Sequence, residues 1–128
     1  MRLLLDTHVF LWALTAPSVL SEHVRGRLLD PRVPVHVSAV SVWELAIKRR
    51  LGRLRDADGI DLAAAITESG FSELPVTGQH AAETEALPDI HRDPFDRLLI
   101  AQSLVEDLTL VTRDDRIRSY PDLALLDA

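Results

Sequence analysis

The chain of 128 residues has no cysteine, which excludes disulfide bonds, zinc–thiolate sites and thiol nucleophiles. Lysine is also scarce: Lys48 is the only one among 14 basic residues, so any chemistry that needs a lysine has to use it. Long apolar runs are missing as well. No segment approaches the ~20 apolar residues of a membrane span. The start of the chain has only a short apolar run before Asp6, whereas a signal peptide needs ~7–15 apolar residues. We therefore expect a cytoplasmic protein with no membrane partner.

The chain does contain enough apolar sequence for one folded domain. Hydrophobic residues make up 47% of it, which excludes a disordered or solvating acidic chain. Its length is close to the ~150 residues of a typical domain, so we expect residues 1–128 to form a single domain. Acidic residues outnumber basic ones by 20 to 14. The net charge of −6 argues against a protein that holds nucleic acid by bulk electrostatics alone.

Short apolar runs alternate with longer amphipathic segments along the chain. The runs predict strands at 3–5, 35–38, 71–76, 108–112 and, weakly, 123–126. Helices are predicted at 8–14, 21–29, 41–51, 60–69, 79–86, 93–107 and 114–119, with Gly52 and Gly70 ending two of them. Strands joined by helical crossovers indicate an α/β fold with a parallel sheet covered on both faces. In such folds the functional site lies at the carboxyl ends of the strands.

Acidic residues recur at those strand ends and at the starts of helices. They occur in four stretches: Leu5-Asp6-Thr7, Ser41-Val42-Trp43-Glu44, Asp93-Pro94-Phe95-Asp96 and Thr112-Arg113-Asp114-Asp115. Each acid taken alone also has a structural explanation, because an acid that precedes a helix suits an N-cap. Ser41 and Glu44 have the spacing of a capping box, and Glu44 and Lys48 have that of a surface ion pair.

The helical neighbours of two acids favour a shared site instead. Asp96 shares its helical row with residues 99, 100 and 103, and Glu44 shares its row with residues 40, 47 and 51. Most of these row-mates are apolar, whereas an acid on a solvated face should have polar ones. We therefore expect Asp96 and Glu44 to point toward the rim of the sheet. Asp6 and Asp114 follow predicted strands and belong at the same rim.

Three or four carboxylates that meet at one rim repel each other, which raises their pKa values and destabilises the fold. Hard divalent cations such as Mg²⁺ or Mn²⁺ relieve this repulsion, because they accept carboxylate oxygens and retain waters. Two such ions about 3.5–4 Å apart can activate a water and stabilise the leaving oxygen of a phosphodiester. Competing chemistries lack their motifs, since the sequence has no dinucleotide or P-loop fingerprint, no G-x-S-x-G and no H-E-x-x-H.

The five histidines are dispersed along the chain. His36 alternates with Val35 and Val37 and is predicted to be a strand residue. His91 lies beside Asp93, but we interpret it as a solvent-exposed loop residue rather than a ligand.

Together these blocks resemble the PIN-domain ribonucleases, and more closely the VapC-type toxins of bacterial toxin–antitoxin pairs. The resemblance is carried by Leu5-Asp6-Thr7, Ser41-Val42-Trp43-Glu44, the run from Asp93 to Ala101 and Leu110-Val111-Thr112-Arg113-Asp114, in that order along the whole chain. It implies a PIN-like three-layer fold, with a five-stranded parallel sheet of order 3-2-1-4-5 flanked by helices. It also implies cleavage of RNA with Mg²⁺ or Mn²⁺, a homodimer, and silencing by a cognate antitoxin.

The resemblance also assigns roles to individual residues. Metal binding and catalysis fall to four acids: Asp6, Glu44, Asp96 and Asp114. Two neighbouring acids are alternative or additional ligands: Asp93 and Asp115. Hydroxyl groups beside the acids either support them or cap helices: Thr7, Ser41 and Thr112. Apart from the resemblance, three basic side chains lie near the acids in the sequence, and we expect them either to contact RNA phosphates or to be solvated or paired with acids: Arg97, Arg113 and Lys48.

A competing hypothesis is a PIN-like protein-binding module whose acids are only structural. In that case Trp12 and Trp43 would serve a partner surface, although core packing is the commoner fate of a single tryptophan. Metal binding separates the two hypotheses, because a ligand that binds only the folded state raises the melting temperature. A DNA nuclease is a third alternative, but the sequence has no groove-reading element.

Overall fold

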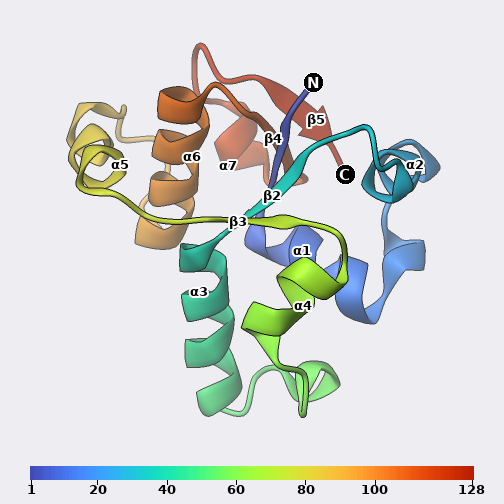
Figure 1. Ribbon diagram of the computed structural model, residues 1–128. Helices are drawn as coiled ribbons and strands as arrows, with labels where there is room; N and C mark the ends of the chain where they lie inside the picture. The colour runs from blue at the N-terminus through green and yellow to red at the C-terminus, as the bar shows by residue number, and fades with distance from the viewer.

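A computed structural model describes residues 1–128 (Figure 1). Five parallel strands form one sheet in the order β3-β2-β1-β4-β5. The strands are β1 (Leu3–Leu5), β2 (Val35–Ser38), β3 (Ser72–Leu74), β4 (Thr109–Thr112) and β5 (Leu125–Asp127). The predicted fold class and strand order are confirmed. The edge strands β3 and β5 are shorter than the predicted segments 71–76 and 123–126.

Helices form the connections between the strands. The α-helices are α1 (Thr7–Thr15), α2 (Glu22–Leu29), α3 (Ala39–Arg50), α4 (Leu62–Glu68), α5 (Gly78–Glu83), α6 (Pro94–Glu106) and α7 (Asp115–Arg118). Short 3-10 turns lie at Pro17–Val19, Arg55–Ala57 and Thr84–Ala86. The last of these turns takes up the end of the helix predicted at 79–86. None of the helices combines the length and apolar character that crossing a bilayer requires.

The central strand β1 contributes to both hydrophobic cores. Its three leucines are completely buried, because β1 pairs with β2 on one side and with β4 on the other. Alternate side chains of a strand point to opposite faces of the sheet. Leu3 and Leu5 accordingly join a cluster with residues of α1, α2 and α4, whereas Leu4 joins a cluster with residues of α6 and α7. Figure 1 shows these two groups of helices on opposite sides of the sheet.

Three of the acids highlighted by the sequence are helix N-caps. Asp6 accepts a hydrogen bond from the backbone N–H of His8, and Asp114 accepts one from the backbone N–H of Arg116. Asp93 caps α6, with a proline at the first helical position. Asp6 directly follows β1, and Asp114 comes two residues after the end of β4, so their capping role also holds them at the carboxyl ends of these strands.

Helix α3 begins two residues earlier than predicted. Ser38 is its N-cap and accepts a hydrogen bond from the backbone N–H of Val40 at 3.1 Å. Ser41 therefore lies inside the helix, and the capping-box explanation for Ser41 and Glu44 is wrong. Gly52 follows the helix with a φ of 75°, a left-handed conformation that suits glycine, and ends it as predicted.

The strand order places a switch point between β1 and β4. The chain builds outward from β1 to β2 and β3, then crosses over to β4 and β5. Ligand sites of open parallel sheets lie where the order reverses, outside the carboxyl ends of the strands. Asp6 and Asp114 occupy this position.

Candidate active site and metal centre

One hollow of about 340 Å³ at the carboxyl end of the sheet is lined by five carboxylates. Asp6 joins β1 to α1, Glu44 lies in α3, and Asp114 follows β4. Asp93 and Asp96 come from the start of α6. The remaining lining residues are His8, Trp12, Lys48 and Arg113. Each of the four sequence blocks therefore contributes at least one acid to the same cavity.

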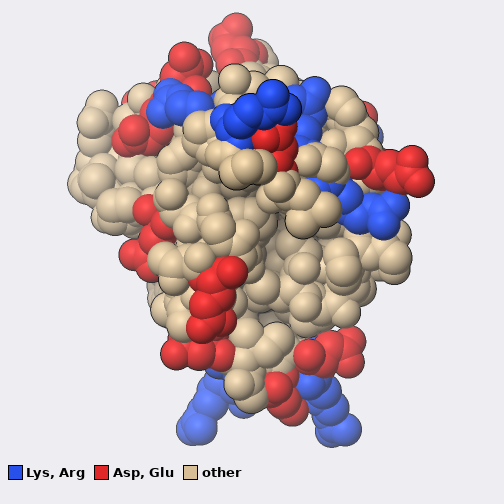
Figure 2. Space-filling model, turned by 45° about the vertical axis from the view of Figure 1, so that its right-hand side comes forward, with Lys and Arg blue, Asp and Glu red and all other residues tan.

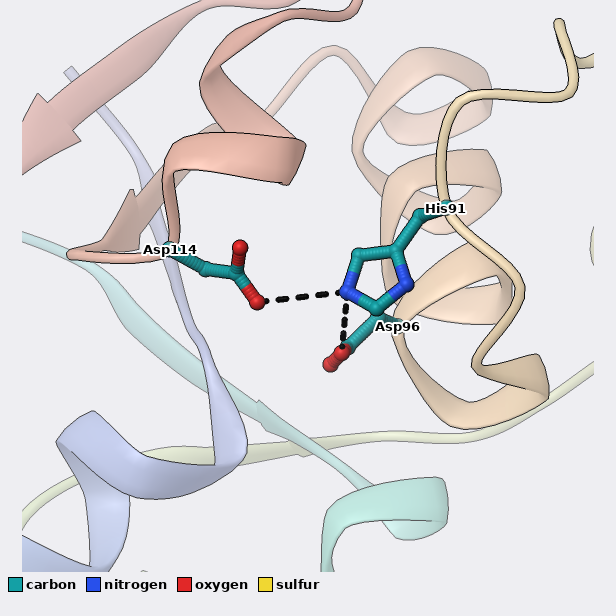
Figure 3. A group of neighbouring side chains, drawn as sticks. All are labelled: His91, Asp96 and Asp114. Carbon is teal, nitrogen blue, oxygen red and sulfur yellow. Dashed lines mark hydrogen bonds and ion pairs between the residues drawn. The ribbon is translucent and has the colours of Figure 1, made fainter.

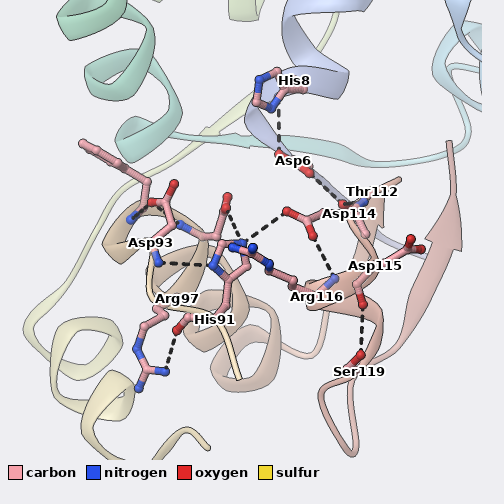
Figure 4. A network of polar contacts seen from close by, with 12 residues as sticks. Asp6, His8, His91, Asp93, Arg97, Thr112, Asp114, Asp115, Arg116 and Ser119 are labelled. Atoms are coloured by element: carbon pink, nitrogen blue, oxygen red, sulfur yellow. Dashed lines mark hydrogen bonds and ion pairs between the residues drawn. The ribbon is translucent and has the colours of Figure 1, made fainter. Parts of the chain in front are cut away.

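Asp6 is almost fully buried, and both of its carboxylate oxygens accept hydrogen bonds (Figure 4). Oδ2 accepts from the Thr112 hydroxyl at 2.6 Å, and Oδ1 accepts from the His8 backbone N–H at 3.3 Å. Burial raises the pKa of Asp6, while the Thr112 hydrogen bond and the charge of His8 act in the opposite direction. The Thr112 hydroxyl also accepts from the backbone N–H of Asp114 at 3.0 Å, so it joins the two acids at the switch point.

Glu44 is only 4% exposed, although it lies in a surface helix. Its Oε2 atom pairs with the Lys48 ammonium at 2.8 Å. Its Oε1 atom is buried and has no hydrogen-bond partner. A buried carboxylate oxygen without a donor destabilises the fold. A hard cation is a partner that would compensate it.

Asp96 has the most perturbed carboxyl group of the hollow. Burial, followed by the negative charges of Asp6, Asp93, Glu44 and Asp114, raises its pKa from the ordinary 3.8 to about 8. In the metal-free protein Asp96 therefore retains a proton at neutral pH. A carboxyl group shifted this far by burial and like charges within a cavity is typical of a functional site.

His91 bridges two of these acids (Figure 3). Its Nε2 atom lies 2.9 Å from Oδ2 of Asp96 and 3.2 Å from Oδ2 of Asp114. Its Nδ1 atom accepts a hydrogen bond from the backbone N–H of Asp93 at 3.1 Å. Because Nδ1 is an acceptor, the neutral ring carries its proton on Nε2 and donates it toward the two carboxyl groups. The side chain is only 6% exposed, so our interpretation of His91 as a solvent-exposed loop residue is wrong.

His91, Asp96 and Asp114 also form a cluster that could hold a metal ion, because one ligand atom of each lies within 4.8 Å of the others. His91 could coordinate through Nε2 only after losing its proton there. The sequence offered a single signal for this residue, its position two residues before Asp93. Its burial depends on the loop conformation, in which the His91 backbone N–H donates to the Tyr120 hydroxyl at 2.8 Å.

Asp114 is more accessible than Asp96. Partial burial acts to raise its pKa, but hydrogen bonds from the Arg116 backbone N–H and from His91 outweigh this effect and lower the pKa below its ordinary value. The hollow thus combines one acid that tends to stay protonated with one that ionises readily. Opposite shifts of this kind separate the roles of neighbouring carboxyl groups.

Two predicted site residues lie away from the acids. The Asp115 side chain is 92% exposed and pairs with Arg118 at 3.2 Å. The Arg97 guanidinium donates instead to four backbone carbonyls: those of Thr84, Leu87, Pro88 and His91. Neither side chain lines the hollow. The Arg97 donors therefore secure the loop that carries His91, and contact of Arg97 with RNA phosphates stays a prediction.

The remaining candidates lie at the hollow or directly behind it. Lys48 and Arg113 belong to its wall. The Thr7 and Ser41 hydroxyls are buried and hydrogen-bond to each other at 2.9 Å, which links the start of α1 to α3. Neither of these residues is a helix cap, nor is Thr112. The hydroxyl groups therefore act as internal partners around the acids.

Comparison with known proteins agrees with this geometry. The model of the PIN domain family matches residues 3–123. Ribonuclease VapC22 of Mycobacterium tuberculosis is 32% identical over 118 residues, covering 91% of this chain and 90% of the relative. Similar solved structures include VapBC2 from Rickettsia felis bound to a promoter DNA fragment, with a TM-score of 0.72 and 16% identity over 99% of this chain and 98% of that one. A toxin–antitoxin complex from Klebsiella pneumoniae has a TM-score of 0.62 and 14% identity over 96% and 94% of the two chains.

Proposed function

Because the chain belongs to the PIN-domain family, we propose that it is a metal-dependent endoribonuclease that acts as the toxin of a toxin–antitoxin pair. The relative from M. tuberculosis carries the name ribonuclease, and the solved structures supply a matching fold. The bond that it hydrolyses is then an RNA phosphodiester. Residues 1–128 act as one nuclease domain.

The observation that carries the proposal is a buried set of carboxylates without enough positive charge. Oε1 of Glu44 has no partner, and the pKa of Asp96 is raised to about 8 by burial and by its neighbours. The lining of the hollow supplies one lysine, one arginine and one histidine against five carboxyl groups. An all-oxygen set of this kind fits Mg²⁺ or Mn²⁺.

We propose that four acids hold one or two of these ions: Asp6, Glu44, Asp96 and Asp114. Asp93 lines the same hollow and is close enough to assist, whereas Asp115 is not. A bound ion would neutralise the phosphate and lower the pKa of the attacking water.

The other side chains of the site prepare the acids for this task. The Thr112 hydroxyl favours the ionised form of Asp6 and fixes its orientation. His91 holds the carboxyl groups of Asp96 and Asp114 near each other. Lys48 and Arg113 bring positive charge to the wall, where an incoming phosphate would pass.

A nuclease of this kind has to be restrained in the cell. We propose that a cognate antitoxin silences it, and that basic groups of this partner complement the acidic hollow. The working form is expected to be a homodimer in the cytoplasm, where the RNA substrate is found.

Substitution of the acids tests the proposal. D6N and D96N are expected to lower RNA cleavage about 100-fold or more at saturating Mg²⁺, because each removes a negatively charged ligand. D115N is the matched control, since it makes the same chemical change just outside the hollow. If D6N and D96N fold and cleave RNA at the wild-type rate, the proposed function is wrong.

Metal binding separates this function from a protein-binding module. Mn²⁺ should raise the melting temperature of the wild-type protein in a concentration-dependent way, and D96N should reduce the shift. A wild-type melting temperature that does not respond to Mn²⁺ would favour the module with structural acids.

A further inference from the structure

The side chain of Trp12 lies between two hollows of the surface. It is the one hydrophobic residue that lines the acidic hollow. It also lines a second hollow of about 430 Å³, formed by the end of α1 and by residues 52–57. No other residue lines both, so the indole ring is the boundary between the acids and the second hollow.

The indole ring is held in a stack of fixed geometry. It is half-buried and packs against the core on the α1 side of the sheet. The guanidinium carbon of Arg113 lies 4.9 Å from the ring centroid, and the His8 ring lies 5.9 Å away at a tilt of 41°. Arg113 is itself anchored, because it donates to the backbone carbonyls of Val19 and Ala128. The stack therefore stands in place before any ligand arrives.

The second hollow offers positive charge beyond the ring. Arg53 and Arg55 line it, both are exposed, and neither side chain makes a hydrogen bond or an ion pair within the chain. Asp56 is the one acid of its lining. Figure 2 shows basic side chains projecting, beside acidic ones, from the lower end of the molecule, the end at which Figure 1 shows α3 stopping. The chain as a whole has a net charge of −6, so two guanidinium groups without ion-pair partners give this hollow a local positive charge that differs from the rest of the protein.

This arrangement matches how single-stranded nucleic acid is bound. Proteins that bind it combine aromatic rings, on which bases stack, with basic groups that follow the phosphates. On the surface of this protein, the Trp12 ring lies next to the acidic hollow, and Arg53 and Arg55 lie beyond the ring in the second hollow. Six of the eleven residues that line the second hollow are hydrophobic, so an apolar protein segment is the competing occupant. The two arginines without ion-pair partners favour a nucleic-acid strand, because its phosphates would neutralise them.

We propose that Trp12 is the stacking platform for a nucleobase of single-stranded RNA, and that Arg53 and Arg55 bind the phosphates next along the strand. The proposal rests on the proposed nuclease function, since the strand is the substrate of the acidic hollow. It assigns the direction in which the RNA leaves the acids, across α1 toward residues 52–57. Arg113 positions the indole ring and remains available to the phosphate beside it.

Binding of RNA to tryptophan variants tests the stacking. The probe is a short 2′-O-methyl oligoribonucleotide of mixed sequence in Mg²⁺. In W43F, Trp12 is the only tryptophan, so the oligonucleotide should quench its fluorescence. W12L should weaken binding about tenfold, and W12F should restore most of the affinity because it keeps a ring. The matched control is W43L, since Trp43 is 61% exposed and lines neither hollow.

The arginines are tested by salt dependence. R53Q/R55Q should weaken binding and lower the slope of log affinity against log salt by roughly one to two, because two phosphate contacts are lost. R27Q/R32Q removes the same charge away from both hollows and should leave the slope unchanged.

The outcomes separate this inference from the function on which it rests. If D6N and D96N abolish cleavage but W12L binds the oligonucleotide as tightly as wild type, the stacking proposal is overturned and the nuclease stands. If W12L spares RNA binding but prevents silencing by a co-expressed antitoxin, the surface docks a protein and the proposal is likewise overturned. If W12L is too unstable to measure, quenching of Trp12 fluorescence in W43F by the oligonucleotide supports the proposal, and the absence of quenching overturns it.

Discussion

The Thr112 hydroxyl donates a 2.6 Å hydrogen bond to Oδ2 of Asp6, across 106 residues of sequence. The same hydroxyl accepts from the backbone N–H of Asp114, so one side chain connects the acids that follow β1 and β4. Burial pushes Asp6 toward its neutral form, and this donor favours the charged form that a cation needs. Thr112 therefore controls the state of Asp6 without facing the hollow itself.

Replacing this hydroxyl gives a first prediction. T112V should raise the pKa of Asp6 and weaken Mn²⁺ binding about tenfold, because a side chain behind a metal ligand typically contributes 10- to 100-fold to affinity. Stability of the metal-loaded protein should fall by about 1–3 kcal/mol. Isothermal titration and thermal melts measure both. The control is T109V in the same strand, whose hydroxyl makes no hydrogen bond, and equal effects of the two variants would contradict this role.

The raised pKa of Asp96 predicts how stability varies with pH. The folded protein holds a proton with a pKa of about 8, whereas the unfolded chain releases it near 3.8. Between these values the native state binds more protons, so stability of the metal-free protein should fall by a few kcal/mol as pH rises from about 4 to about 8. Denaturant melts across this range check it. D96N should flatten the decline, and a wild-type profile that rises over the same range would be inconsistent with a protonated Asp96.

Metal binding should displace that proton. At pH 7 Asp96 is mostly protonated, so binding of Mn²⁺ is expected to release about one proton per protein. Calorimetry in two buffers of different ionisation enthalpy counts the protons. The number should decrease toward zero above pH 9 and should be smaller for D96N. An unchanged count in D96N would assign the proton to another group.

Arg97 should matter for the fold of the loop rather than for substrate. Its guanidinium binds the carbonyls of Thr84 and Pro88 at 2.8 and 2.9 Å, and two further carbonyls at longer distance. R97Q should lower stability by about 2–4 kcal/mol and speed hydrogen exchange across residues 84–93. R92Q removes an exposed neighbouring charge and should change stability by less than about 0.5 kcal/mol. If R97Q instead raises the KM for RNA without affecting exchange, Arg97 contacts the substrate after all.

Most of the strands could be predicted from the sequence, because each strand end has a clear sequence signal. Short apolar runs followed by an acid or a hydroxyl specified β1, β2 and β4, and the order 3-2-1-4-5 then brings their carboxyl ends together. The row of apolar neighbours correctly predicted that Asp96 faces inward, since Leu99 and Ile100 are fully buried. For these strands and for Asp96, the burial expected from the local sequence pattern is the burial that the folded structure shows.

Where packing between distant segments decides the outcome, the sequence was a poorer guide. The helical row that Glu44 shares with Val40, Ile47 and Leu51 is only partly buried. Val40 is buried, whereas Ile47 and Leu51 are 37% and 59% exposed. Glu44 is nevertheless only 4% exposed, so an apolar stripe of α3 is not what buries it. The sequence does not reveal the partners of His91 and Arg97 for a similar reason, because these partners depend on the path of the loop from residue 84 to residue 93.

The position of β1 between β2 and β4 also bears on how the protein is made. The first strand of the chain meets its second neighbour only after residues 109–112 have been synthesised, and Thr112 cannot reach Asp6 before then. On the ribosome, Asp6, Glu44 and Asp96 are therefore synthesised before β4 and Asp114, which complete the lining of the hollow. On the proposed function, the set of acids is complete only after β4 and Asp114 have left the ribosome and β4 has paired with β1.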